Sequence, residues 1–149
     1  MPEIKKILFP IDFSESTNKL LPYVITFAQK FTSTIHLLYV VRDLNYLSGF
    51  HVPHTSLLGM EEEIVRSATK KMEVIIEEDL KGYPDVVTKV KVGDAANEII
   101  TYAKEQGIDL ILMGTHGRKG LEHALFGSVA ERVVKNSPVP VLTVNPYKV

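Results

Sequence analysis

The sequence predicts an α/β fold in which a five-stranded parallel sheet lies between two layers of helices, a doubly wound three-layer arrangement. Short apolar runs alternate along the 149 residues with longer segments that carry an apolar stripe and a charged face. The short runs are apolar on both faces, which is typical of parallel strands buried under helices and joined by right-handed crossovers. The length is that of one domain, so we expect residues 1–149 to form a single domain.

The expected strands are runs rich in β-branched and aromatic residues. They are Ile4 to Pro10, Thr34 to Val41, Val86 to Val92, Leu110 to Met113 and Val139 to Val144. Helices are expected where apolar residues recur at three- and four-residue spacing. These are Leu20, Leu21, Val24, Phe27, Ala28 and Phe31 in the first helix and Ile64, Ala68, Met72, Ile75 and Ile76 in the second, followed by helices over Ala95 to Glu105 and Val129 to Lys135.

Two segments interrupt this pattern. Pro22 lies inside the first helical stripe, where proline removes a backbone donor and costs about 3 kcal/mol, so we expect a helix that starts late, near Lys19, or bends at Pro22. The segment Asp43 to Gly59 has no clear periodicity and is long for an α/β connection. It is the candidate for a mobile lid or a partner-contact loop.

Composition excludes several classes of function. Seventeen basic and eighteen acidic residues give a net charge of −1, so the basic surface typical of nucleic-acid binding is not expected. The chain has no cysteine, which excludes disulfides, thiol catalysis and the commonest structural zinc sites. No stretch approaches eighteen apolar residues, so no membrane span is expected and a soluble cytoplasmic protein is the default.

The stretch from Gly114 to Ser128 is the most informative part of the sequence. Four glycines join an apolar run to the start of a helix, and such a loop lets backbone N–H groups and the positive end of the helix dipole approach an anion. A Walker loop is excluded because Lys119 is followed by Gly120 rather than by a hydroxyl residue. A dinucleotide loop is excluded because Pro10-Ile11-Asp12 follows the first strand in place of a glycine fingerprint.

The spacing that remains, Gly114-x2-Gly117-x9-Gly127-Ser128, resembles the nucleotide-binding signature of the universal stress protein family, in its ATP-binding branch. Lys6 to Ser14 and Val92-Gly93-Asp94 also resemble that family's first strand and a later strand-to-helix turn. The resemblance implies the strand order 3-2-1-4-5, in which the carboxyl ends of strands one and four form the ligand crevice. It also implies ATP as the ligand, with Mg²⁺ or Mn²⁺ held through the phosphates.

The predicted nucleotide site joins the ends of three strands to the glycine-bearing loop. Its residues are Pro10, Ile11, Asp12, Val40, Val41, Met113, Gly114, His116, Gly117, Arg118, Gly127, Ser128 and Val129. Asp12 has two interpretations, a turn or capping carboxylate, or an acceptor for the hydroxyl and amino donors of adenosine. In the resembled family a valine backbone at the position of Val40 and Val41 touches the adenine ring.

The start of the last helix also has two interpretations. Ser128 and Glu131 have the spacing of a capping box, with Ser128 as N-cap, whereas the upstream glycines favour phosphate contact through the amides of Gly127, Ser128 and Val129. The basic residues of the loop are solvated surface charge or phosphate ligands, with Arg118 the favoured side chain. They are His116, Arg118, Lys119 and His123.

Two further local patterns are assigned structural roles or set aside. Gly93 and Asp94 are expected to form a strand exit and an N-cap. A metal site at His51 and His54 is disfavoured because Pro53 opposes a helix there and no third ligand is near.

The favoured function is a nucleotide-dependent regulatory or stress-response protein that holds ATP as a signal. Hydrolysis is expected to be slow at most, because the sequence lacks a Walker lysine–hydroxyl pair and a group aimed at a γ-phosphate. The alternative is a dimeric interaction module with a vestigial pocket or one for another adenosine compound. In both, the apolar strand from Val139 to Val144 is expected to pair across a two-fold axis as a homodimer, as in the resembled family. An unknown protein partner would read the ligand state. An adenylate-forming enzyme is disfavoured, since no histidine-containing phosphate motif follows Ser14.

Overall fold

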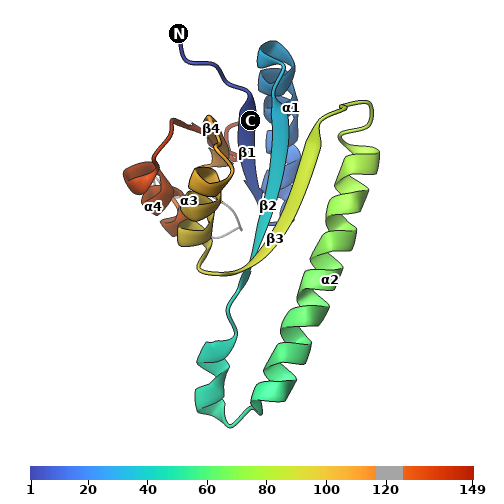
Figure 1. Cartoon of the computed structure of the whole chain (residues 1–149), viewed down its shortest axis with the longest axis vertical. Coiled ribbons are helices and arrows are strands. Elements are labelled where there is room, and N and C mark those ends of the chain that lie inside the picture. The colour runs from blue at the N-terminus through green and yellow to red at the C-terminus, as the bar shows by residue number, and fades with distance from the viewer. Residues whose placement is uncertain (117–125) are drawn as a thin grey trace.

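The computed structural model describes residues 1–116 and 126–149, which form a parallel sheet in the order β3-β2-β1-β4-β5 with helices on both faces (Figure 1). The strands are β1 (Lys6–Ile11), β2 (Thr34–Arg42), β3 (Val86–Gly93), β4 (Leu110–Gly114) and β5 (Val141–Val144). The helices are α1 (Glu15–Phe31), the 3-10 helix η1 (Asn45–Phe50), α2 (His54–Glu78), α3 (Ala95–Glu105) and α4 (Ser128–Asn136). The predicted fold class and strand order are confirmed.

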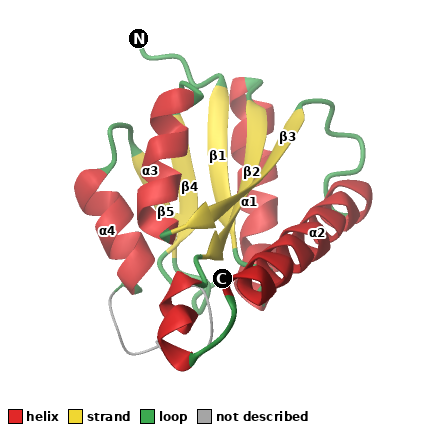
Figure 2. Ribbon diagram, turned by 60° about the horizontal axis from the view of Figure 1, so that its bottom comes forward, coloured by secondary structure: helices red, strands yellow, loops and turns green. Residues whose placement is uncertain are grey.

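Alternation along the strands divides the core into two layers. Ile7 and Phe9 of β1 point into a cluster with α1 and α2, whereas Leu8 between them points into a second cluster with α3 and α4. All three side chains are almost fully buried. Figure 2 shows the resulting arrangement, with helices covering the sheet from both sides. This double burial explains why the strands are apolar on both faces.

The order of the strands separates two connections at the centre of the sheet. β1 pairs with β4 on one side and with β2 on the other, all in parallel. The chain leaves β1 for α1 on one face of the sheet, and after β4 it reaches α4 on the opposite face. The connections that leave the carboxyl ends of β1 and β4 therefore diverge, which opens a crevice at this edge of the sheet.

Helix α1 begins earlier than the proline predicted. Ser14 is its N-cap, and the Ser14 hydroxyl accepts a hydrogen bond of 3.2 Å from the amide of Ser16. The helix runs from Glu15 through the exposed Pro22, so the late start near Lys19 is wrong. A capped first turn and the buried stripe around Leu20 and Val24 outweigh the donor that proline removes.

The segment Asp43 to Gly59 is mostly helical rather than a loop, and its role as a lid or a partner contact stays a prediction. It contains η1 and the first turns of α2, which extend beyond the carboxyl end of β2 (Figure 1). The amide of Leu44 donates to Glu61 Oε1 over 3.2 Å, and Leu57 is buried. These tertiary contacts order a segment whose sequence lacks a periodic stripe.

The N-termini of α3 and α4 differ in how they are capped. Asp94 caps α3 as predicted, with Oδ2 accepting from the amide of Asn97 over 3.0 Å. At α4 the N-cap is Gly127, not Ser128, and Glu131 pairs with Lys135 instead of reaching back to the cap. The predicted capping box is therefore wrong.

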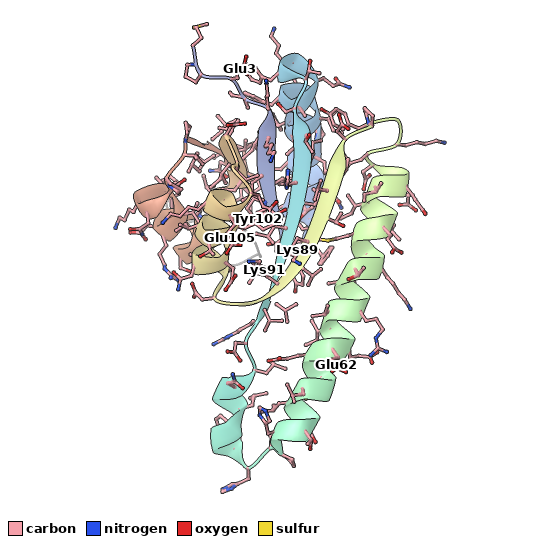
Figure 3. All side chains as sticks on the ribbon, in the orientation of Figure 1. Glu3, Glu62, Lys89, Lys91, Tyr102 and Glu105 are labelled. Atoms are coloured by element: carbon pink, nitrogen blue, oxygen red, sulfur yellow. The ribbon has the colours of Figure 1, made fainter. Side chains whose placement is uncertain are left out.

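Ion pairs join β3, at the edge of the sheet, to α3. The Lys91 ammonium of β3 lies 3.6 Å from Glu98 Oε2 and 3.4 Å from Glu105 Oε2 of α3, and Figure 3 labels Lys91 and Glu105.

A buried polar pair joins β2 to α3. His36 Nδ1 lies 2.8 Å from the Tyr102 hydroxyl, and both residues are almost fully buried. Burial lowers the pKa of the His36 imidazole below its ordinary value, and the positive charge of Lys6 lowers it further.

Within residues 1–116 and 126–149, no helix has both the length and the apolar character needed to cross a bilayer.

We expect the free energy of unfolding to fall as the pH decreases below about 6.5, the ordinary pKa of histidine. The folded-state pKa of His36 is lowered, so the unfolded state binds more protons in this range and acid favours unfolding. Urea unfolding between pH 8 and pH 5 measures the slope. His36→Gln should reduce it, whereas His54→Gln, at an exposed histidine of α2, should leave it unchanged. Equal slopes in the two variants would contradict this assignment.

Candidate functional site

A cavity of about 440 Å³ lies at the carboxyl ends of β1, β2 and β4, between the first turns of α1, α3 and α4. It gathers residues that are far apart in the sequence. The predicted site residues that line it are Pro10, Ile11, Asp12, Val40, Met113, Gly114, His116, Gly127, Ser128 and Val129. Val41 is not among the lining residues, and its side chain is buried. Gly117 and Arg118, with Lys119 and His123, lie outside the described residues.

Several lining residues were not predicted. They include Ser16, Thr17, Leu20, Tyr39, Arg42, Ala95, Ile99 and Thr115. A sequence signal existed for two groups: Ser16 and Thr17 follow the Asp12 turn at the start of a helix, and Ala95 follows the predicted N-cap Asp94. For the apolar side chain of Ile99 no signal distinguishes the wall of a cavity from ordinary core.

The Asp12 carboxylate is held in a fixed orientation by hydrogen bonds from the start of α1. Oδ1 accepts from the Ser14 amide over 2.9 Å, from the Ser14 hydroxyl over 2.5 Å and from the Thr17 hydroxyl over 3.1 Å. The predicted turn role of Asp12 is thus confirmed. The same carboxylate lines the cavity, where it presents hydrogen-bond acceptors.

An aromatic pair lies beside Asp12, and one of its members, Tyr39, lines the cavity. Phe13 has a backbone φ of 60°, in the left-handed region that a bulky side chain rarely adopts and that costs about 1–2 kcal/mol. Its ring lies 4.6 Å from that of Tyr39, a cavity residue, and the Lys71 ammonium of α2 stands 5.3 Å from the Phe13 centroid. These contacts hold the strained residue in place and connect α2 to the cavity wall.

Gly114 and Gly127, at the two ends of the loop, both pack closely against the backbone of Thr115 and His116, and this narrow backbone contact is called the neck. The amide of Gly127 donates to the carbonyl of Thr115 over 2.7 Å, and the amide of Thr115 donates to Val144 of β5 over 2.9 Å. A Cβ atom at Gly114 would lie 2.9 Å from the carbonyl oxygen of His116, so a side chain there would displace the backbone. At Gly127 a Cβ would lie 3.3 Å from the Thr115 carbonyl. The close approach of these backbone segments explains the glycines.

His116 is buried in this neck, so its interpretation as solvated surface charge is wrong. Its Nδ1 lies 2.8 Å from the Thr115 hydroxyl, and its ring lies 5.4 Å from that of Tyr147 near the carboxyl end of the chain. The imidazole therefore packs the base of the neck while lining the cavity.

The first turn of α4 gives the cavity hydrogen-bond donors, whereas Asp12 gives it acceptors. Gly127 caps α4, and its carbonyl accepts the first helical bond, from the amide of Glu131 over 3.0 Å. The preceding amides of Ser128, Val129 and Ala130 belong to the first turn, where helix geometry supplies no acceptor. Together with the positive end of the helix dipole, they give this wall an affinity for anions. The cavity thus has acceptors at Asp12 and donors at α4.

Comparisons with known proteins identify the family of this chain. Residues 3–145 match the Universal stress protein family. The universal stress protein MJ0577 of Methanocaldococcus jannaschii is 36% identical over 152 residues, which cover 94% of each chain. Its solved structure superposes with a TM-score of 0.82 at 33% identity, over 95% of this chain and 96% of that one.

Two more distant structures share the fold. One is a universal stress protein in complex with cAMP, with a TM-score of 0.62 and 18% identity over 97% of this chain and 98% of that one. The other is the universal stress protein from Archaeoglobus fulgidus in complex with dAMP, with a TM-score of 0.60 and 16% identity over 97% of this chain and all of that one. From the match over residues 3–145 and the close relative, this chain belongs to the universal stress protein family.

Proposed function

We propose that the cavity binds an adenine nucleotide, ATP with Mg²⁺ or Mn²⁺ on its phosphates, and that the protein is a nucleotide-dependent regulator. The observation that carries this proposal is the hydrogen bond from Gly127 to Thr115, which brings the first-turn amides of α4 to the cavity that Asp12 lines. A nucleotide has the matching polarity, with donors on the nucleoside and anionic phosphates at the other end. Two relatives that share the fold were solved with cAMP and dAMP, which supports this ligand class.

In this proposal the phosphates lie against α4 and the nucleoside lies toward Asp12 and Val40. A carboxylate close to the phosphates would repel them, so Asp12 serves the donors of the nucleoside instead. The cation is carried by the phosphates, since no three histidine, aspartate or glutamate side chains gather as a metal site in the part of the chain that the structure describes. ATP acts as a signal, with slow hydrolysis at most.

Calorimetric titration with ATP, ADP and AMP, each with and without Mg²⁺, tests the proposal. ATP should bind more tightly than AMP, because contacts to the α4 amides grow with the phosphate chain. Mass spectrometry of the purified protein under native conditions should detect a bound nucleotide. If none of the three nucleotides binds, the cavity is vestigial or accepts another adenosine compound, and the proposal is wrong.

Gly127→Val should weaken ATP binding by about tenfold or more. A side chain here would lie against the Thr115 carbonyl and shift the adjoining amides, and such overpacking costs about 1–3 kcal/mol. Gly59→Val is the matched control, because Gly59 lies on α2 and a Cβ added there meets no described atom within 4 Å beyond the adjoining residues and the nearby backbone of the helix. Unchanged ATP affinity in Gly127→Val would refute the position of the phosphates.

Asp12→Asn should weaken ATP binding by about fivefold to tenfold, since one acceptor oxygen becomes an amino group and a charge-assisted hydrogen bond is lost. Titrations with 2′-deoxy-ATP, which lacks the ribose 2′-hydroxyl, and with ITP, which lacks the amino group of adenine, identify the donor that Asp12 recognises. The analogue without that donor should bind the wild type and Asp12→Asn with equal affinity. Tighter binding of ATP to Asp12→Asn would instead place the carboxylate beside the phosphates, contrary to the proposal.

We also propose a homodimer through β5, with or without nucleotide. The carbonyls of Pro140 and Val144 accept bonds from Ile111 of β4 and from Thr115, which follows it. By strand alternation the backbone groups of Val141 and Thr143 therefore face the open edge of the sheet. Apolar edge strands in native proteins are usually paired or covered. Pairing with a second copy across a two-fold axis would satisfy these groups.

Thr143→Pro should convert this dimer to a monomer in sedimentation equilibrium. Proline removes the outward amide of Thr143 while leaving the bonds between β4 and β5 in place. Thr143→Val keeps that amide and should remain dimeric, and thermal unfolding of both variants controls for a general loss of stability. A Thr143→Pro dimer as tight as the wild type would exclude this edge as the interface.

A further inference from the structure

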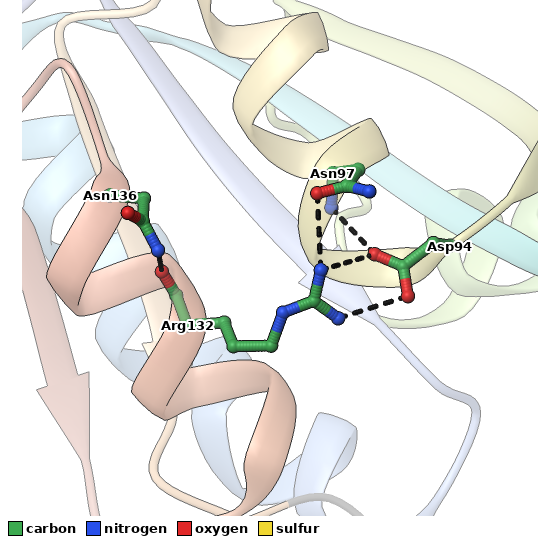
Figure 4. Close-up of polar contacts among 4 residues, drawn as sticks. All are labelled: Asp94, Asn97, Arg132 and Asn136. Atoms are coloured by element: carbon green, nitrogen blue, oxygen red, sulfur yellow. Dashed lines mark hydrogen bonds and ion pairs between the residues drawn. The ribbon is translucent and has the colours of Figure 1, made fainter.

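An ion pair links α3 and α4, two of the helices that begin at the cavity. Arg132 of α4 donates from Nη1 to Asp94 Oδ1 over 2.9 Å and from Nη2 to Asp94 Oδ2 over 2.8 Å (Figure 4). Nη2 also donates to Asn97 Oδ1 over 3.1 Å. The pair is therefore a bidentate fork with a third bond, the geometry in which an arginine–carboxylate pair fixes relative position as well as attracting.

The carboxylate in this fork also belongs to the start of α3. Asp94 caps α3 through the amide of Asn97, and the hydrogen bonds from Arg132, followed by that amide, lower the pKa of Asp94. The pair therefore stays ionised throughout the neutral range. The next residue, Ala95, lines the cavity. One end of the fork is thus fixed to the part of α3 that forms the cavity wall.

The other end of the fork lies one turn into α4. Arg132 follows Ser128 by four residues and Val129 by three, so its Cα lies about 6 Å along the helix from Ser128 and about 4.5 Å from Val129. Helix α4 has nine residues, and it is held to the core by the buried Ala130 and Val133. Those apolar contacts are non-directional, whereas the fork fixes the distance and direction between the starts of α3 and α4.

We propose that Arg132 is a positioning residue for the phosphate part of the ligand. By holding α4 against Asp94, it sets where the amides of Ser128 and Val129 stand in the cavity. Arg132 thereby governs the preference of the site for a nucleotide over its nucleoside. This inference rests on the proposed function, because it concerns the same cavity.

The experiment compares ATP with adenosine, since only ATP reaches the α4 amides in the proposed arrangement. Arg132→Met, which keeps an unbranched stem, should weaken ATP binding by about threefold to fivefold and leave adenosine binding unchanged. The size follows from the modest strength of a half-exposed pair, whose side chains are 46% and 47% accessible. The same exposure means that the variant should fold normally, which thermal unfolding checks.

Two control variants separate position from charge. Arg132→Lys keeps the charge but cannot form the bidentate pair with Asp94. It should therefore weaken ATP binding nearly as much as Arg132→Met does. Lys135→Met removes a positive charge from the same helix, where the Lys135 ammonium pairs with Glu131 of α4 at 2.9 Å, and it should bind ATP like the wild type. If Arg132→Lys matches the wild type, or if Lys135→Met matches Arg132→Met, the effect is one of charge and the positioning role is overturned.

The outcomes distinguish this inference from the proposed function. If the wild-type chain binds ATP and Arg132→Met weakens ATP and adenosine equally, the positioning role fails and nucleotide binding stands. If the wild-type chain binds no adenine nucleotide, the proposed function fails, and the positioning role fails with it. As a further check, Asp94→Asn keeps a cap acceptor for α3, and combining it with Arg132→Met should weaken ATP no more than Arg132→Met alone.

Discussion

The pairing of β1 with β4 is the constraint on which the cavity depends. The two strands are in register at Ile7 with Leu110 and at Leu8 with Ile111, and these four side chains are buried on alternate faces of the sheet. Because the chain leaves β1 toward one face and reaches α4 from β4 on the other, the strand ends cannot be covered by one connection. The opening between them is a consequence of topology, and Asp12 and Gly114 meet there because each directly follows or ends one of these strands.

The chemistry of the cavity follows from which backbone and side-chain groups the two connections contribute. On the β1 side, Asp12 collects donors from Ser14 and Thr17, so its remaining capacity is to accept. On the β4 side, the Gly127 amide is used by Thr115, and this bond leaves the first turn of α4 facing the cavity with donors. A ligand that matches both walls has donors at one end and negative charge at the other.

The sequence predicted the elements whose signal is local and missed those decided by distant contacts. The strands were placed to within two residues, and Ala95–Glu105 was placed to the residue, because apolar periodicity and a capping aspartate specify them. The capping box at Ser128 failed because a bond from the neighbouring glycine to Thr115 fixes where the helix starts. The burial of His116 depends on Tyr147, which is close only in the folded chain. The glycine spacing predicted that Gly114, His116 and Gly127 line the cavity. It did not predict Tyr39 or Ile99, because their place in the cavity wall depends on residues that are near them only in the folded chain.

In the proposed function the ligand is held as a signal, and such a role needs physical contact between the site and the surface of the protein. Here Phe13, the strained residue next to Asp12, touches the cavity residue Tyr39 on one side and the Lys71 ammonium of α2 on the other. These contacts form a continuous path from the acceptor wall to a helix whose outer face is exposed. Thermodynamic linkage constrains any such path in both directions. A partner that binds the α2 surface more tightly when the cavity is filled must tighten the binding of the cavity ligand by the same factor. The affinity of the site would then depend on what is docked on α2, so the ligand concentration to which the protein responds would be set jointly by the cavity and by the partner.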